Sequence, residues 1–183
     1  MGRKDFGLGP DIALLNLAPS DVATIKAHKS FLNLAQQKGA LAEYSPVIEK
    51  GLWSVTGMVG EFTEVQPNPE QRTVTCHIQG EAFISSVQQT YEQNGYDYFD
   101  LGAKLDLPGS PSSFIGVSGG GLWQIRLSKA KSGEISWDGK RIFRGVAFWE
   151  SKESDDHLII RCHGPKSIFE KAWDSWALTS GMK

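Results

Sequence analysis

The sequence predicts an all-β protein, a barrel or a sandwich, with a helical segment before it and a helix at its end. Three observations support this fold class. From about residue 51 onward, short runs rich in β-branched and aromatic residues recur at fairly even spacing. Residues that favour turns, mainly Gly, Pro, Asn and Asp, separate these runs. The 183 residues are also enough for a single large β domain with a substantial core.

Two elements are predicted before the β-rich region. Residues 11–17 (DIALLNL) form a short, mostly apolar run, which is the length of a buried strand. Ser20 and Asp21 are good N-cap residues, and an uneven apolar stripe follows them as far as Gly39. We therefore expect a strand over 11–17 and a helix or helical linker over 20–39.

The β-rich region is predicted to contain strands separated by turns. The predicted strands are 51–60, 72–80, 81–91, 96–105, 120–129, 141–150 and 156–164. The predicted turns are 65–71, 92–95, 107–113, 131–134, 137–140 and 151–156. After the last strand, Pro165 suits a first helical turn and Gly181 a helix end, which predicts a C-terminal helix with one apolar stripe.

The composition argues against several functional classes. The formal net charge of −2 gives no electrostatic basis for binding nucleic acid or an anionic membrane surface. No apolar run approaches the roughly 18 residues of a transmembrane helix, and residues 1–10 lack the apolar region of a secretory signal. Cys76 and Cys162 do not form a disulfide framework and have no zinc-ligand spacing. We expect a cytoplasmic protein that binds no metal or other cofactor.

Residues 114–123 (FIGVSGGGLW) surround one serine with glycines, which allow positive φ angles and close approach of a ligand to the backbone. This segment is not a phosphate-binding loop, because no Lys-Ser/Thr pair follows the glycines. It is not the strand-to-helix turn of the α/β hydrolases either, because a strand follows. Two interpretations stay open at this point: a nucleophilic serine, or a flexible connection between strands.

The segment GVSGG, followed by an apolar strand, resembles the G-x-S-G-G motif of the chymotrypsin-like (trypsin-like) serine peptidases. The upstream run DIALLNL resembles the family's Asp-Ile-Ala-Leu-Leu stretch. RGVAFW (144–149) resembles its cleft-lining strand, and HLIIRC its closing strand before the C-terminal helix. These motifs occur in the family's order between about residues 11 and 177. The resemblance implies a β-barrel fold and peptide-bond hydrolysis through a serine acyl-enzyme.

The resemblance also implies roles for individual residues. Ser118 corresponds to the nucleophile and Asp11 to the carboxylate that orients the base. The N–H groups of Gly116 and Ser118 correspond to the oxyanion hole and should converge on one point. Phe148, Trp149 and Glu150 correspond to the substrate cleft, and 107–113 to the border of the pocket entrance. This chain departs from the family at two sites, because Val117 replaces an acidic residue and Gly121 a proline.

A third departure concerns the base, because no histidine precedes Asp11. His28 is expected to be solvated or half-buried, His77 to pack or to face water, and His157 to be solvated in a turn. His163 is a candidate for lining the specificity pocket, but it lies on the wrong barrel to act as the base. The resemblance therefore implies a complete second barrel and a first barrel reduced to the strand that carries Asp11. The expected division is a barrel remnant with helical linker over 1–40, and a C-terminal barrel with its helix over 41–183.

These observations lead to one favoured function and two alternatives. The favoured function is a trypsin-like serine peptidase domain that acts on a peptide or protein, inactive in this chain for lack of the histidine. The missing segment is explained either by a shortened form of an active enzyme or by a natural pseudoenzyme. The first alternative is a non-catalytic peptidase-like module that binds a protein or peptide. The second is an unrelated β-barrel whose glycines only form a turn.

Loss of the first barrel has two further implications. The strand over 11–17 would have unpaired backbone groups and exposed apolar side chains, so it should pair with a second copy, a separate missing half or residues 1–10. Asp11 should also be displaced from Ser118, too far for one imidazole to bridge them. We therefore expect that the chain is not a simple monomer.

Overall fold

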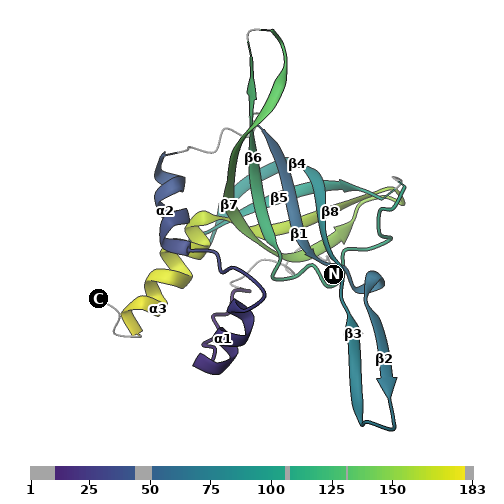
Figure 1. Cartoon of the computed structure of the whole chain (residues 1–183). Helices are drawn as coiled ribbons and strands as arrows, with labels where there is room; N and C mark the ends of the chain where they lie inside the picture. The colour runs from purple at the N-terminus through teal and green to yellow at the C-terminus, as the bar shows by residue number, and fades with distance from the viewer. Residues whose placement is uncertain (1–10, 44–50, 106–107, 131, 180–183) are drawn as a thin grey trace.

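The computed structural model describes residues 11–43, 51–105, 108–130 and 132–179 (Figure 1). Its main body is a closed barrel of antiparallel strands in the order β1–β4–β5–β8–β7–β6. These strands are β1 (Leu52–Met58), β4 (Gly80–Gln93), β5 (Tyr96–Lys104), β6 (Gly121–Lys129), β7 (Ile135–Lys152) and β8 (His157–His163). The expectation of a mainly β protein is thus confirmed.

The core of the barrel is mainly apolar, because alternate residues of each strand point inward and most of these are hydrophobic. Its most deeply buried side chains include Val55, Leu101, Leu122, Ile160 and Cys162. Burial raises the pKa of the Cys162 thiol well above its usual value. Both cysteines are free thiols, and Cys76 is exposed.

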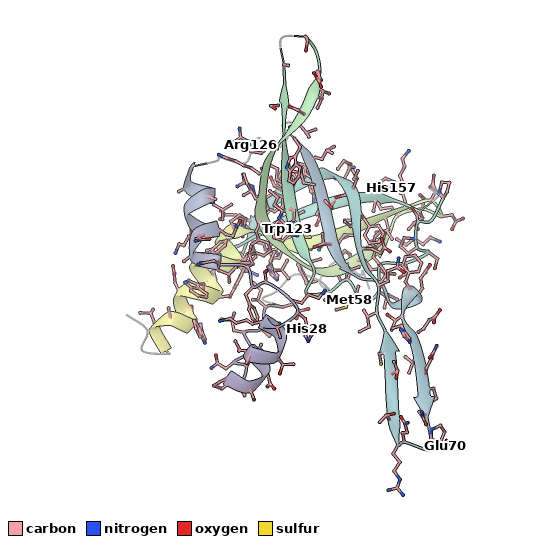
Figure 2. The ribbon with its side chains drawn as sticks, in the orientation of Figure 1. His28, Met58, Glu70, Trp123, Arg126 and His157 are labelled. Atoms are coloured by element: carbon pink, nitrogen blue, oxygen red, sulfur yellow. The ribbon has the colours of Figure 1, made fainter. Side chains whose placement is uncertain are left out.

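A two-stranded ribbon extends away from the barrel (Figure 1). It follows the short 3₁₀ helix η1 (Gly60–Phe62) and consists of β2 (Glu64–Asn68) and β3 (Thr73–His77), with Glu70 near its tip (Figure 2). The predicted turn over 65–71 is therefore wrong in its first half. β2 contains Pro67, and an isolated ribbon tolerates proline because each of its strands has one free edge.

β7 is longer than expected and runs through 137–140, where the sequence predicts a turn. The register with β6 jumps there, so that Ile125 pairs with Arg141 but Leu127 pairs with Trp137. Gly139 adopts a φ of 79° within this irregularity. The turn-forming residues therefore produce a bulge in the strand and do not reverse the chain.

The helical regions also differ from the prediction. The single helix expected over 20–39 is two helices, α1 (Pro19–Lys26) and α2 (Leu34–Glu43), joined by 27–33. The predicted strand over 11–17 is wrong, because these residues have no regular secondary structure. The C-terminal helix is present as π-helical turns, η2 (Lys166–Trp173), followed by α3 (Asp174–Thr179), and the expected end at Gly181 lies outside the described residues.

α2 and η2 cover the outer face of β6 and β7 (Figure 1). The apolar side chains of this layer are Leu34, Leu41, Trp123, Phe143, Val146, Ile168 and Phe169. Lys38 of α2 forms an ion pair with Asp174 at 3.1 Å. The Asp97 carboxylate of β5 accepts hydrogen bonds from the N–H groups of Lys166 and Ser167, so it caps the start of η2. Within the described ranges, no helix has the length and apolarity needed to cross a bilayer.

Candidate functional site

The loop before β6 consists of two consecutive turns. In the first, the Val117 N–H donates to the Phe114 carbonyl at 3.0 Å, and in the second the Gly120 N–H donates to the Val117 carbonyl at 2.7 Å. Gly116 and Gly119 occupy the third positions of these turns, with φ angles of 100° and 86°. A turn with positive φ at its third position is of type II, which favours glycine there. Two of the glycines around Ser118 are thus explained by backbone conformation.

These turns leave two N–H groups of the loop unused. Within the described part of the chain, neither the Gly116 nor the Ser118 N–H donates a hydrogen bond, whereas those of Val117, Gly119 and Gly120 do. Types I and II differ by a flip of the central peptide, so the positive φ of Gly116 fixes the orientation of the 115–116 peptide. The loop therefore contains two N–H groups that are not used within the described residues. Their convergence on one point stays a prediction.

Contacts with two neighbouring segments, η1 and β7, hold the loop in place. The Gly60 N–H of η1 donates to the Ile115 carbonyl at 2.7 Å. On the other side, Gly119 N–H donates to the Ala147 carbonyl, and Ala147 N–H donates to the Gly120 carbonyl, each at 2.8 Å. The third tie precedes the loop, where the N–H and hydroxyl of Ser112 both donate to the Glu61 carboxylate. The loop is thus fixed to β7 and to η1.

A cavity of about 280 Å³ lies between this loop and β7. Its lining residues are Phe114, Ile115, Gly116, Val117, Ser118, Ala147, Phe148, Trp149, Glu150 and Ile160. Ser118 is exposed at this cavity, and its hydroxyl donates to the Phe148 carbonyl at 3.3 Å. The nucleophile, oxyanion-hole and cleft residues expected from the sequence therefore meet at one site, apart from Asp11. Two residues of the segment 107–113, the expected border of the pocket entrance, form hydrogen bonds next to the loop: Ser112 donates to Glu61 and Ser113 donates to Glu150.

A β-bulge in β7 orients the cleft residues. β7 pairs with β8 through Ala147 and Cys162, and then through Trp149 and Arg161, so Phe148 is the extra residue. An extra residue in one strand changes the direction of the following side chains, and such bulges are common beside active sites. This local irregularity allows Phe148 and Trp149 to line the same cavity.

Glu150 connects the two walls of the cavity. Its carboxylate accepts a hydrogen bond from the Ser113 hydroxyl at 2.7 Å and another from the Phe114 N–H at 2.7 Å. Because Glu150 belongs to β7 and its partners belong to the loop, the side chain spans the gap between them. The sequence predicted Glu150 as a cleft residue but gave no sign of this connection.

A second cavity, of about 380 Å³, lies on the other side of Ser118. Asp11 to Leu14 form part of its wall, together with Ser118, Phe148 and residues of α2 and η2. The candidate carboxylate and the candidate nucleophile therefore border the same cavity, although 11–17 is not a strand. The expected displacement of Asp11 from Ser118 stays a prediction.

None of the four histidines lines either cavity. His163, which the sequence considered for pocket lining, is fully buried and stacks on the Phe148 ring at 4.3 Å. His157 begins β8 and is partly buried, which corrects the expectation of a solvated turn (Figure 2). His28 and His77 are exposed, on the connection after α1 and on the ribbon. In the described ranges, no three His, Cys, Asp or Glu side chains are grouped to hold a metal ion.

Sequence reasoning missed a row of side chains that ends at the cavity. Adjacent strands pair Gln89 with Asp100, Asp100 with Arg161, and Arg161 with Trp149. Arg161 donates to both Asp100 oxygens at 2.7 and 2.8 Å, and its guanidinium lies 4.7 Å from the Trp149 ring centre. The hydrogen bond to Asp100 raises the pKa of Arg161. The available signal was a charged residue inside each of two largely apolar strands, Asp100 and Arg161.

The class of fold that these observations define is a closed antiparallel β-barrel with a serine loop between two cavities. No model of a known protein family matches the chain, and no match was found among curated proteins or solved structures.

Proposed function

We propose that this chain is a trypsin-like serine peptidase domain in which Ser118 is the nucleophile. One observation carries the proposal: the exposed Ser118 borders a cavity together with Gly116, and the backbone N–H groups of both residues donate no hydrogen bond within the described residues. A closed barrel followed by a C-terminal helix also agrees with the architecture that the sequence resemblance implies. Both cysteines are free thiols, in keeping with the proposed reducing, cytoplasmic setting.

The proposed reaction is acyl transfer from a peptide to serine and then to water. The Ser118 oxygen attacks the carbonyl carbon while a base takes the hydroxyl proton, and the carbonyl oxygen becomes an oxyanion. The two N–H groups bind this oxyanion, and one such donor contributes about 2.7–4 kcal/mol to the transition state. The C–N bond then breaks, the amine leaves with the proton, and water hydrolyses the ester.

The base is the missing component of this reaction. No histidine of the chain lines the cavity that Asp11 shares with Ser118. A serine without a base is a weak nucleophile near neutral pH. We therefore propose that an imidazole from another polypeptide segment enters this cavity and is oriented there by Asp11, a proposal that gives up the expected displacement of Asp11 from Ser118. The chain by itself is inactive or nearly so.

Free imidazole tests this proposal, because it can replace the missing side chain. A fluorophosphonate probe reports the reaction, since the serine oxygen bonds to phosphorus, fluoride leaves and the base takes the proton. We expect slow modification of Ser118 without imidazole and a rate increase of at least about tenfold with it. Peptide mapping by mass spectrometry measures the rate and identifies the modified residue.

Three variants make this experiment specific. Ser118→Ala should abolish modification, and Asp11→Asn should remove most of the imidazole effect while leaving the slow basal rate. Asp21→Asn is the matched control, because Asp21 is an exposed carboxylate in the first turn of α1 and lines neither cavity. A reaction that persists in Ser118→Ala, or an imidazole effect that Asp11→Asn does not change, contradicts the proposed roles.

The second candidate function is a non-catalytic module that binds a peptide or protein partner. The absence of all four histidines from the two cavity walls favours it. This function predicts peptide binding at the 280 Å³ cavity without serine modification under any imidazole concentration. The imidazole experiment therefore separates the two candidates.

Self-association is also part of the proposal. The unpaired strand expected over 11–17 is not formed, but Leu14, Leu15 and Leu17 are exposed, Leu15 to 83%. Exposed apolar side chains that are adjacent in sequence favour burial against another surface. We expect light scattering coupled to size exclusion to give a mass above 20.1 kDa that rises with concentration.

The matched control for self-association is a substitution of an exposed side chain of similar size elsewhere on the surface. Leu14→Ser together with Leu15→Ser should shift the mass toward that of the single chain. Ile84→Ser should not, although Ile84 is 70% exposed, because it lies on the barrel in β4. A mass equal to the single chain at every concentration contradicts the prediction.

A further inference from the structure

The ribbon of β2 and β3 is exposed over its whole length. Within the described part of the chain these two strands pair only with each other, and they project away from the barrel (Figure 1). Every residue of β3 is exposed to solvent, as is every residue of β2 except Asn68. A two-stranded hairpin by itself is marginally stable in water, whereas three or more strands with a hydrophobic face are stable. The ribbon therefore gains stability from any strand that extends it.

The side chains of the ribbon are sorted onto an apolar and a polar face. Residues directly opposite each other in an antiparallel pair lie on the same face. Val65 pairs with Cys76 and Pro67 pairs with Val74, so these four side chains form the apolar face. Val65 and Val74 are 60% and 62% exposed. The opposite face consists of Glu64, Gln66, Asn68, Thr73, Thr75 and His77.

The two outer edges of the ribbon differ in how well they are protected. Exposed edges of sheets commonly carry charged residues or proline, which discourage pairing with another strand. β2 contains both, because Glu64 is charged and the nitrogen of Pro67 has no hydrogen to donate. β3 (TVTCH) contains no Asp, Glu, Lys, Arg or Pro, and its first three residues are β-branched, which favours strand formation. The free edge of β3 is thus the one that can accept a further strand.

We propose that β3 pairs in antiparallel orientation with β3 of a second copy of this chain, which gives a four-stranded sheet in the order β2–β3–β3–β2. Thr75 is the middle residue of β3, so a two-fold axis through it pairs all five residues of the strand with those of the second copy. This register places Val74 opposite Cys76 of the second copy and extends the apolar face over four strands. Because the strands are antiparallel and the ribbon projects from the barrel, the two barrels lie at opposite ends of the sheet (Figure 1).

The distribution of charge agrees with a second copy as the partner. Glu64 is the one Asp, Glu, Lys or Arg in β2 and β3, and it lies on the outer strand, away from its own copy. Arg72, which directly precedes β3, lies at the same end of the proposed sheet as Glu64 of the second copy, which has the opposite charge. Glu70 lies near the tip of the turn, beyond the paired strands (Figure 2). The inference involves neither Ser118 nor the cavities, so it is independent of the proposed function.

Cysteine cross-linking tests the register directly. Thr75→Cys is made together with Cys76→Ser, so that position 75 carries the exposed thiol, while Cys162 is buried. Directly opposed residues of antiparallel strands have Cα atoms about 4.5–5.5 Å apart, which is within the range of a disulfide. With glutathione disulfide as the oxidant, two thiols of the protein form a disulfide and glutathione is reduced to its thiol. We expect a covalent dimer, measured by gel electrophoresis without reductant.

Gln66→Cys, also made together with Cys76→Ser, is the matched control. Gln66 is exposed, pairs with Thr75 and lies on the same face of the ribbon. It belongs to β2, however, so the two copies of position 66 would be three strand spacings apart, about 14 Å. We expect the dimer to form at least about tenfold faster with Thr75→Cys than with Gln66→Cys.

A second measurement needs no covalent bond. Thr75→Lys places two like charges directly opposite each other across the two-fold axis, which opposes pairing. Gln66→Lys adds the same charge to the outer strand and is its control. Both are made in a chain that also carries Leu14→Ser and Leu15→Ser, so that association through 11–17 does not contribute. By light scattering, the mass should fall toward 20.1 kDa with Thr75→Lys and stay unchanged with Gln66→Lys.

Equal rates of dimer formation in the two cysteine variants, or equal masses of the two lysine variants, would overturn the inference. So would a dimer that forms faster through the native Cys76 than through Thr75→Cys, because the ribbons would then meet by their apolar faces and not by their edges. None of these results depends on modification of Ser118, so failure of the proposed catalysis is detected separately by the fluorophosphonate experiment.

Discussion

Replacing Asp100 by alanine is expected to lower the free energy of unfolding by about 3 kcal/mol, because it breaks a buried ion pair. The side chains of Asp100 and Arg161 are only 7% and 14% exposed, and Arg161 donates to both carboxylate oxygens. Without the carboxylate, the guanidinium stays largely out of water and loses its compensating charge. Urea unfolding followed by circular dichroism measures the loss.

Asp155→Ala is the matched control for this prediction. Asp155 also forms an ion pair, with Lys152 at 2.9 Å, but both side chains are well exposed to solvent. Exposed pairs contribute little, so the unfolding midpoint should not change. Equal midpoints for Asp100→Ala and the unmodified protein would show that the Asp100 pair is not stabilising.

A spectroscopic titration reports the same pair independently of stability. Burial, first, and the charge of Asp100, second, raise the pKa of Tyr91 to about 12. Asp100→Asn removes the second cause, so the Tyr91 phenol should ionise at lower pH. Between pH 10 and about 12, Tyr91 therefore stays protonated in the folded protein, whereas it is ionised in the unfolded chain. The contribution of Tyr91 to stability is therefore present below pH 10 and is lost as the pH rises from 10 to about 12.

The strands of the barrel could be predicted from sequence because their signals are local. Runs such as 96–105 and 156–164 combine apolar and β-branched residues between turn residues, and β5 and β8 lie there. The prediction of a strand over 11–17 was wrong because strand formation there depends on residues outside the segment. Its apolar residues are compatible with a strand. A strand also needs neighbouring strands for hydrogen bonding, and the sequence of this segment alone does not say whether they are present.

The candidate site could likewise be predicted only in part, where its features depend on residues that are close in sequence. The two glycines with positive φ, Gly116 and Gly119, are recognisable from the sequence because backbone conformation is local. The Glu150 connection to Ser113 and Phe114 joins residues more than thirty positions apart, so only the fold reveals it. The row of Asp100, Arg161 and Trp149 depends on strand register, which hydrophobic periodicity alone does not determine across four strands.

Replacing Gly120 by alanine is expected to cost about 3 kcal/mol of stability and to displace the Ser118 loop. An added Cβ would overlap the Thr56 carbonyl oxygen and lie 2.7 Å from the Val117 carbonyl oxygen. Both obstacles are backbone atoms, one in β1 and one in the turn that Gly120 closes, so neither can move aside as a flexible side chain would. The loop must shift away from β1 to relieve the overlap.

Two other glycines separate steric overlap from backbone strain. A Cβ on Gly119 meets nothing within 4 Å, but its φ of 86° is unfavourable for alanine, so Gly119→Ala should cost only about 1 kcal/mol. Gly80, at the start of β4, also has open space and no positive φ, so Gly80→Ala should leave the unfolding midpoint nearly unchanged. Thermal unfolding of the three variants measures this order.

The same three variants connect stability with the proposed chemistry. A shifted loop moves the Ser118 hydroxyl and the Gly116 N–H together, because the hydrogen bonds of Gly119 and Gly120 to Ala147 hold both against β7. Imidazole-dependent fluorophosphonate modification should therefore fall steeply in Gly120→Ala, at a temperature where that variant is still folded, and persist in Gly80→Ala. Equal rates in the two variants would mean that the close approach of Gly120 to Thr56 does not position the serine.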